Sequence, residues 1–244
     1  MEDNQRNLLI LGASSDLGCE LIRKVVNKYD IIIGHYNHMN DNLLQLKEQY
    51  PDKLQLLQAD FSDVNSIKDF ISEIKDNNWH PAHIVHFAAP RVQYLRYEQA
   101  SIECFESEMK TSLYSLVSVT QAFLPMMKKK RCGKIIVMLT AYTQGTPPKF
   151  MSTYVTSKYA MLGLVKSLAA DYADKGIQVN GVSPEMIETK FLDNIPDFVR
   201  QQNAESNPLK RNLTVEDVIP TFEYLLSDAA NCITGQNICI TGGK

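Results

Sequence analysis

The sequence lacks any long hydrophobic run. Nothing in its 244 residues reaches the roughly 18 consecutive apolar residues that a membrane-spanning helix requires. The first residues, Met1 to Asn7, are polar and contain no apolar stretch of signal-peptide length. These two absences predict a cytoplasmic protein without a membrane partner.

A strong charge of either sign is also missing. The chain has 25 Lys and Arg residues against 28 Asp and Glu residues, a formal net charge of −3. Such a balance gives no general attraction to nucleic acid, so we expect no nucleic-acid partner. A composition of 44% hydrophobic and 22% charged residues is ordinary for a globular protein, and the length predicts one domain covering residues 1–244.

Cysteines are few, odd in number and scattered. No two of them form a C-x-x-C pair, and no histidine cluster has the spacing of a metal site. The sequence therefore predicts no metal and buried, reduced thiols. The five residues are Cys19, Cys104, Cys132, Cys232 and Cys239.

Short apolar runs alternate with amphipathic segments of helical length. The runs cover residues 8–11, 31–33, 54–57, 83–87, 135–139, 177–182 and 236–240. Runs too short for helices, separated by helices, indicate βαβ units. The sequence thus predicts an α/β fold, a single Rossmann-type doubly wound parallel sheet of about seven strands with helices on both faces. In such sheets ligands bind beyond the carboxyl ends of the strands.

The first strand-to-helix turn, residues 12–18, carries a glycine at each end. Gly12 allows a tight turn, and the free N–H groups of the following helix make a site for a pyrophosphate. A tight turn without a ligand is the alternative, because many strand-to-helix turns contain two glycines.

Tyr154 and Lys158 stand four residues apart on a predicted helix. This spacing places the phenol and the ammonium on one face, where the positive charge stabilises phenolate and lowers the tyrosine pKa. Thr140, at the end of the preceding strand, can direct a hydroxyl to the same point. The alternative is a surface tyrosine beside a lysine that extends to solvent.

Joined in chain order, these segments resemble the short-chain dehydrogenase/reductase family from Leu8 to Gly243. The glycine turn stands where the family has T-G-x-x-x-G-x-G, and Tyr154 with Lys158 fits its Y-x-x-x-K motif. Asp60 follows the third strand, residues 184–189 match P-G-x-I-x-T, and residues 225–243 look like the family's C-terminal segment. Among subfamilies the closest resemblance is to 3-oxoacyl-[acyl-carrier-protein] reductases.

The resemblance implies an oxidoreductase that moves hydride between a nicotinamide and a carbonyl or alcohol substrate, with a carrier-bound 3-oxoacyl chain as one candidate. Tyr154 would be the general acid and base, and Lys158 would hold the nicotinamide ribose and lower the Tyr154 pKa. Thr140 would bind the substrate oxygen, and Ser112 stands where the family has a water-holding Asn. A homo-oligomer, tetramer or dimer, is also implied.

Contacts to the cofactor are implied at the matching motif positions. No acidic residue follows the second strand, which favours NADP(H) over NAD(H), with Asn37 and His38 at the phosphate; an exposed loop histidine is the alternative for His38. The implied contacts are Gly12, Ser14, Ser15, Asp16, Leu17, Gly18, Asn37, His38, Asp60, Phe61, Ala88, Tyr154, Lys158, Ile187 and Thr189.

Among the departures from the family pattern, four weigh most: Asp16, Phe87, Ser112 and Glu185. Asp16 replaces the middle glycine of the turn, where it either caps the helix or repels the pyrophosphate. The four departures support an alternative, a catalytically impaired binding subunit or pseudoenzyme that acts in a heteromeric assembly or a non-redox step.

Two further segments carry expectations. Residues 189–212 are expected to form a lid over the substrate, with an apolar contribution that could equally pack on the sheet, from Met186, Phe191, Leu192, Phe198 and Val199. The basic cluster at residues 128–131, with Lys175, could receive an acidic carrier protein near the cleft. The alternative is that these cations offset the negative ends of helices.

Overall fold

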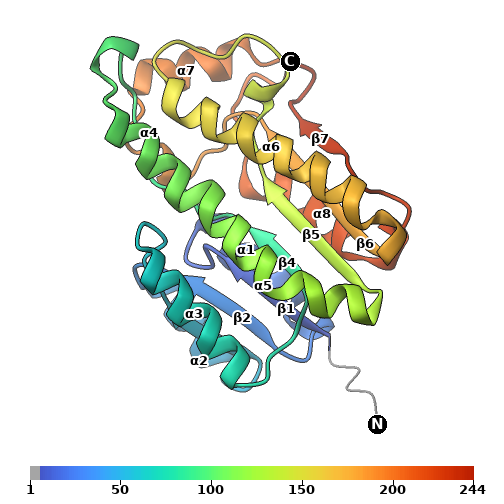
Figure 1. Ribbon diagram of the computed structural model, residues 1–244. Coiled ribbons are helices and arrows are strands. Elements are labelled where there is room, and N and C mark those ends of the chain that lie inside the picture. The colour runs from blue at the N-terminus through green and yellow to red at the C-terminus, as the bar shows by residue number, and fades with distance from the viewer. Residues whose placement is uncertain (1–5) are drawn as a thin grey trace.

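All seven apolar runs form strands in the computed structural model, which describes residues 6–244 (Figure 1). The strands lie parallel in the order β3-β2-β1-β4-β5-β6-β7. The order reverses between β1 and β4, so the sheet is doubly wound as predicted. The first five residues of the polar start lie outside the described range. The strands are β1 (Asn7–Leu11), β2 (Ile32–Tyr36), β3 (Leu54–Gln58), β4 (Pro81–His86), β5 (Gly133–Met138), β6 (Ile177–Pro184) and β7 (Asn237–Ile240).

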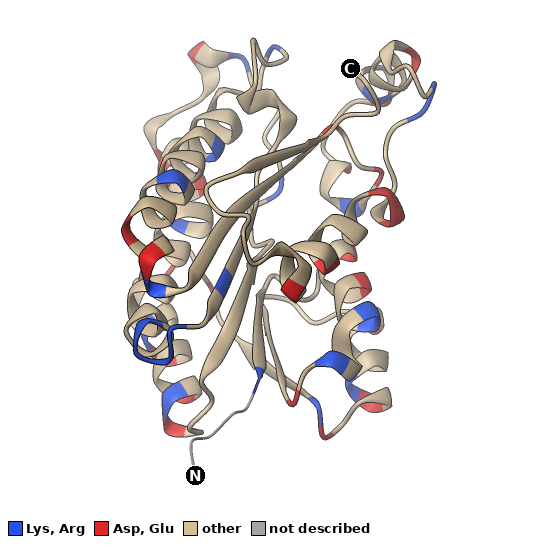
Figure 2. Ribbon diagram, turned by 90° about the vertical axis from the view of Figure 1, so that its right-hand side faces the viewer, with Lys and Arg blue, Asp and Glu red and all other residues tan. Residues whose placement is uncertain are grey.

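Helices cover both faces of the sheet, which Figure 2 shows between two helical layers. One layer contains α1 (Asp16–Val25), α2 (Asp41–Gln49) and α8 (Val215–Leu226), and the other contains α3 (Val64–Asp76), α5 (Ser115–Lys130) and α6 (Ser152–Tyr172). Alternate residues of β1 enter opposite cores, Leu8 and Ile10 on one side and Leu9 and Leu11 on the other. The apolar runs are continuous because both faces are buried.

The helices start where side chains satisfy their first N–H groups. The Ser15 hydroxyl accepts from the Gly18 N–H at 3.0 Å and caps α1, and Asn40 accepts from the Leu43 N–H at 2.9 Å and caps α2. Asn40 also donates to the Ser14 carbonyl oxygen at 2.6 Å. This bond fixes the loop after β2 against the turn after β1.

The long helix before β5 changes its winding part-way. It begins as α4 (Ile102–Glu108), continues as a π-helical segment (Met109–Tyr114), and then becomes α5. A π segment of this kind is rare and occurs frequently at functional sites. Here α4 and the π segment pack against α6, the helix that carries Tyr154.

The cysteine expectation is partly wrong. All five cysteines are free, but only Cys19 is buried, while Cys132, Cys232 and Cys239 are exposed. Cys239 is exposed because β7 is an edge strand of the sheet, and the other two lie in turns. Within residues 6–244 no helix is long and apolar enough to cross a membrane, and no group of His, Cys, Asp and Glu residues could hold a metal ion.

The basic cluster at residues 128–131 lies at the opposite end of the sheet from the carboxyl ends of the strands. Its lysines form the last turn of α5, immediately before β5 begins. Arg131 takes the left-handed conformation that ends the helix, and its guanidinium donates to the Asp174 carbonyl oxygen at 2.8 Å. The expectation of a carrier-protein contact near the cleft is therefore wrong, and the position fits cations that offset a helix end.

Candidate active site

A cavity of about 820 Å³ opens at the carboxyl ends of β1, β4, β5 and β6. It brings together every residue that the sequence singles out for cofactor or catalysis except Gly18 and Ser112. The predicted residues that line it are Gly12, Ser14, Ser15, Asp16, Leu17, Asn37, His38, Asp60, Phe61, Ala88, Thr140, Tyr154, Lys158, Ile187 and Thr189.

Gly12 and Gly18 shape the turn at one end of this cavity. Gly12 has a φ of +88°, and a Cβ there would lie 2.8 Å from the Ala88 nitrogen, so the turn can approach the end of β4 only with glycine. A Cβ on Gly18 would lie 2.5 Å from the Gly12 carbonyl oxygen. Gly18 therefore packs α1 against the turn from behind and does not itself face the cavity.

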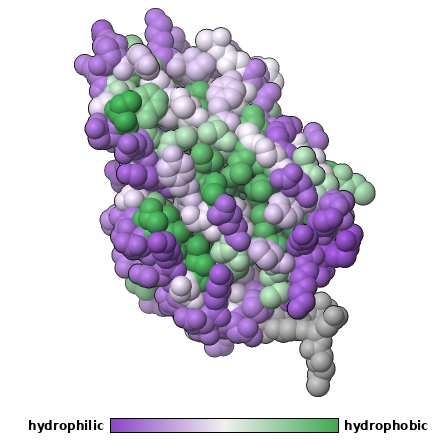
Figure 3. All heavy atoms as spheres, in the orientation of Figure 1, coloured by the Kyte–Doolittle hydropathy of each residue, from purple (hydrophilic) through white to green (hydrophobic). Residues whose placement is uncertain are grey.

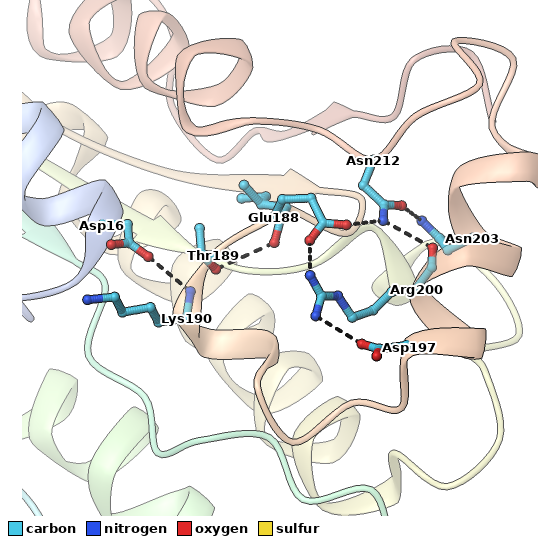
Figure 4. Close-up of polar contacts among 9 residues, drawn as sticks. Asp16, Glu188, Thr189, Lys190, Asp197, Arg200, Asn203 and Asn212 are labelled. Atoms are coloured by element: carbon cyan, nitrogen blue, oxygen red, sulfur yellow. Dashed lines mark hydrogen bonds and ion pairs between the residues drawn. The ribbon is translucent and has the colours of Figure 1, made fainter.

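Asp16 does not cap α1, because Ser15 holds that position. The Asp16 carboxylate instead accepts a hydrogen bond from the Lys190 backbone N–H at 3.0 Å, across the cavity mouth (Figure 4). The capping expectation is thus wrong. Asp16 joins the first turn of α1 to the segment that follows β6, and its negative charge lies at the positive end of the helix.

Two residues that sequence reasoning missed support the end of the cavity near β2 and β3. His35 accepts from the Gly12 N–H at 3.1 Å through Nδ1, donates to the Ala59 carbonyl oxygen at 3.0 Å through Nε2, and stacks on Phe61 at 3.6 Å. Burial lowers the His35 pKa to about 4, so the ring is neutral. Asn40 is the other residue, through its bond to the turn.

Asp60 lies at the same end, in the turn after β3. Its carboxylate accepts from the Ser62 N–H at 2.8 Å and from the Ser62 hydroxyl at 2.7 Å. These two hydrogen bonds lower the pKa of Asp60, so a carboxylate faces the cavity at neutral pH. Asn37 and His38, in the loop after β2, are exposed on its rim.

Thr140, Tyr154 and Lys158 converge at the other end of the cavity. All three are buried, and the Lys158 ammonium lies 5.6 Å from the centre of the Tyr154 ring. Lys158 donates to the Met138 carbonyl oxygen at 2.9 Å. Burial raises the pKa of Tyr154, while the neighbouring Thr140 hydroxyl lowers it. The expected lowering of the Tyr154 pKa by Lys158 is not seen in this structure, where burial sets the direction of the shift.

Ser112 and Glu108 lie behind this group rather than in the cavity. Ser112 is fully buried, and its hydroxyl has no hydrogen-bond partner among residues 6–244. Glu108, one turn earlier, is 1% exposed and lacks a partner for either carboxylate oxygen in the same range. The burial of Glu108 could not be predicted from the sequence, because a glutamate inside a helical segment normally faces water.

The substrate side of the cavity is mostly apolar but contains one acid. Glu185 is buried, and its carboxylate lies 3.8 Å from the Lys244 ammonium. Of the apolar residues expected here, Phe198 and Val199 do not line the cavity, and Phe198 is 67% exposed. The apolar lining consists of Val92, Met151, Met186, Phe191, Leu192 and Ile195.

Polar contacts hold residues 189–212 in place (Figure 4). Arg200, on α7 (Asp197–Ser206), pairs with Glu188 at 2.5 Å and with Asp197 at 3.4 Å. Asn212 donates to the Glu188 carboxylate at 2.5 Å and accepts from Asn203 at 2.8 Å. Glu188, directly before the segment, therefore binds Arg200 in its middle and Asn212 at its end.

The residues present fit a nicotinamide dinucleotide. The cavity volume lies in the range typical of ligand sites, about 300–1,000 Å³. The N-terminus of α1 points N–H groups at one wall, where a pyrophosphate is stabilised, and Lys158 stands at the far end. Asp16 lies in this same turn, and its negative charge opposes the phosphates.

A protein-family model described as "Enoyl-(Acyl carrier protein) reductase" matches residues 26–244. The chain belongs to the short-chain dehydrogenase/reductase family. It is an NAD(P)-dependent oxidoreductase of that family, and the resemblance stated from the motifs is confirmed.

Named relatives agree with this assignment. The chain is 28% identical over 245 residues to the 3-oxoacyl-[acyl-carrier-protein] reductase FabG of Buchnera aphidicola subsp. Acyrthosiphon pisum, covering 100% of this chain and 98% of the relative. Two solved structures share the fold, each covering 98% of both chains. ElxO with NADP bound has a TM-score of 0.86 at 22% identity, and 4-hydroxyisoleucine dehydrogenase complexed with NADH has 0.89 at 23%.

Proposed function

We propose that this short-chain dehydrogenase/reductase uses NADPH to reduce a carbonyl group, and that its substrate is a 3-oxoacyl thioester on a carrier protein. The observation that carries the proposal is the convergence of Thr140, Tyr154 and Lys158 at one end of a cavity that begins at the glycine turn. The name of the 28% identical Buchnera relative supports the choice of substrate.

In this proposal the side chains divide the proton chemistry among them. When bound, the reduced nicotinamide supplies the hydride that adds to the carbonyl carbon. Tyr154 gives its hydroxyl proton to the carbonyl oxygen as negative charge develops there. The Thr140 hydroxyl donates a hydrogen bond to the same oxygen, and Lys158 holds the nicotinamide ribose hydroxyls.

The dinucleotide would lie along the lining residues described above. The first turn of α1 would hold the pyrophosphate, Asp60 would accept from the adenine amino group, and Ile187 with Thr189 would orient the nicotinamide amide. NADP(H) is favoured over NAD(H) because the loop at Asn37 and His38 contains no carboxylate to bind a ribose 2′-OH.

Residues 189–212 would act as the lid over the substrate. Leu192 and Ile195 turn apolar side chains into the cavity, next to Met186 and Met151. An acyl chain would contact this apolar wall. The polar contacts of Glu188 and Arg200 would set how far the lid opens.

A homo-oligomer, dimer or tetramer, is part of the proposal. Hydrophobic residues gather at the centre of the face that α5 and α6 cover (Figure 3), and Tyr114 and Tyr159 in this region are half-exposed. Such a patch supports association of two copies through these helices. Light scattering tests this point, and a monomer at micromolar concentration would contradict it.

The competing function is a binding subunit or pseudoenzyme, which the Asp16 bond to Lys190 and the buried Glu185 favour. Titration of nicotinamide fluorescence with NADPH and NADH separates the two. We expect saturable binding with NADPH tighter than NADH. Absence of binding of either dinucleotide at millimolar concentration would overturn the enzyme function.

Substrate choice is tested by following NADPH oxidation with matched thioesters. A 3-oxoacyl thioester should be turned over, whereas the corresponding enoyl thioester and a small ketone without a thioester should not. Turnover of the enoyl thioester alone would refute carbonyl reduction. Turnover of the small ketone alone would refute the carrier-bound substrate.

A further inference from the structure

The carboxylate of Glu108 is buried in an unusual place. It lies at the end of α4, directly before the π segment, and only 1% of the residue is exposed. Both oxygens lack a hydrogen-bond partner among residues 6–244. Burying an ionised carboxylate without a compensating charge is very costly, so a buried carboxyl takes up a proton unless a cation nearby offsets its charge.

The Lys158 ammonium, on α6 against which α4 packs, is the cation whose charge acts on Glu108. Lys158 is 2% exposed and, among residues 6–244, makes one hydrogen bond, to the Met138 carbonyl oxygen, although an ammonium has three donors. Burial lowers the pKa of Lys158, and the Glu108 charge raises it. Burial raises the pKa of Glu108, whereas the Lys158 charge and the Ser157 hydroxyl lower it. Each buried charge therefore favours the charged form of the other.

The remaining groups around the pair do not replace Glu108. On α6 the Ser157 hydroxyl donates to the Tyr154 carbonyl oxygen at 2.8 Å, and Tyr154 itself is neutral because burial raises its pKa. On β4 the buried His86 is also neutral, because burial lowers its pKa to about 3. Glu108 is thus the one anionic group acting on Lys158 in this part of the described chain.

We propose that Glu108 is a positioning residue of the active site: its buried carboxylate keeps Lys158 in the charged form that the nicotinamide ribose and Tyr154 require. The inference rests on the proposed function, in which Lys158 acts as an ammonium. Glu108 is not one of the motif residues, and the proposal explains why its carboxylate is buried. Ser112, one turn later, offers an unpartnered hydroxyl on the same side.

The test measures the ionisation of Lys158 itself. Lysine labelled with carbon-13 at Cε is incorporated into the full chain, and the Lys158 signal is assigned by its loss in Lys158→Met. In Glu108→Gln we expect the titration midpoint of Lys158 to fall by about one pH unit or more, because an opposite charge nearby shifts a pKa by about 1–3. An unchanged midpoint would overturn the proposal.

Three more variants separate charge from packing. Glu108→Leu removes the charge with an apolar side chain of similar size and should give the same fall as Glu108→Gln, even if one of the two folds poorly. Glu108→Asp keeps the charge and should restore most of the midpoint. Glu106→Gln, on the same helix but exposed and paired with Lys110 at 3.4 Å, is the matched control and should change nothing.

Turnover gives a second readout. In the alcohol-oxidising direction, which needs the Tyr154 phenolate, Glu108→Gln should match wild type at low pH and fall about tenfold for each pH unit above the lowered Lys158 midpoint. An equal loss at every pH would indicate a purely structural role and contradict the proposal. If wild type has no turnover while the midpoint still shifts, the proposed function fails and the role of Glu108 in Lys158 ionisation stands.

Discussion

Asp16 is the side chain that most affects phosphate binding at the glycine turn. Its carboxylate lies in the first turn of α1 and accepts a hydrogen bond from the Lys190 N–H. It therefore lies close to the helix N-terminus where a cofactor phosphate would bind. A phosphate placed near it is disfavoured by about 1 kcal/mol, since two like charges 4 Å apart in water interact by about that amount.

Replacement of Asp16 should therefore tighten cofactor binding. We expect Asp16→Asn to lower the Kd for NADPH about fivefold, because 1 kcal/mol corresponds to roughly that factor. Isothermal titration calorimetry measures the change, with Glu20→Gln, on the same helix but outside the cavity, as the control. Weaker binding by Asp16→Asn would show that the Lys190 contact helps the cofactor.

Among single residues, the sequence predicts those whose role depends on their spacing along one helix or turn. Tyr154 and Lys158 are four apart on one helix, so their common face follows from helix geometry. Glu108 and His35 could not be found in this way, because their burial depends on packing between elements distant in the chain. The bond between Asp16 and Lys190 could not be predicted either, since the two residues are 174 positions apart.

Among the elements, α7 and the loops beside it combine a small apolar cluster, which includes Leu192 and Ile195, with polar contacts. Arg200 joins Glu188 and Asp197 across the base of the lid, and the Arg200 side chain is 33% exposed. Ion pairs of this kind contribute about 0–1 kcal/mol to stability. Their effect should be on lid position rather than on folding.

Arg200→Ala should therefore raise KM for the substrate severalfold and leave the free energy of unfolding within about 1 kcal/mol of wild type. Steady-state kinetics and urea unfolding measure the two quantities. Arg23→Ala, which removes an exposed ion pair with Glu20 at 3.3 Å on α1, serves as the control. Equal KM values for both variants would contradict a role of Arg200 in the lid.

The seven strands could be predicted from the sequence, but the π-helical segment between α4 and α5 could not. Each strand is an apolar run, because the sheet is buried on both faces. The π segment at Met109–Tyr114 has no such signal, since its residues suit an ordinary α-helix and its extra width depends on packing against α6.

For the whole molecule, three buried histidines link folding to pH. Burial lowers the pKa of His35 to about 4 and of His83 and His86 to about 3, against an ordinary value of 6.5. The unfolded chain therefore takes up these protons first as the pH falls below 6.5, and the free energy of unfolding decreases. Burial raises the pKa of Glu108, so this group increases the free energy of unfolding as the pH falls. Its effect is smaller than the combined effect of the three histidines.

As the pH is lowered from 6.5 to about 4, we expect the free energy of unfolding, measured with urea, to decrease. Each histidine contributes up to about 1.4 kcal/mol per pH unit. His83→Gln should remove one such contribution to the slope, whereas His38→Gln, at an exposed site, should leave the slope unchanged. Identical slopes in His83→Gln and wild type would contradict this account of the buried histidines.

The central claim is that Tyr154 is the proton donor of an NADPH-dependent carbonyl reductase. The most direct measurement compares wild type with Tyr154→Phe, following NADPH oxidation with a 3-oxoacyl thioester and NADPH binding by fluorescence. We predict that Tyr154→Phe binds NADPH like wild type and loses about a hundredfold to ten-thousandfold in turnover. Turnover of the thioester by Tyr154→Phe at the wild-type rate would contradict the claim.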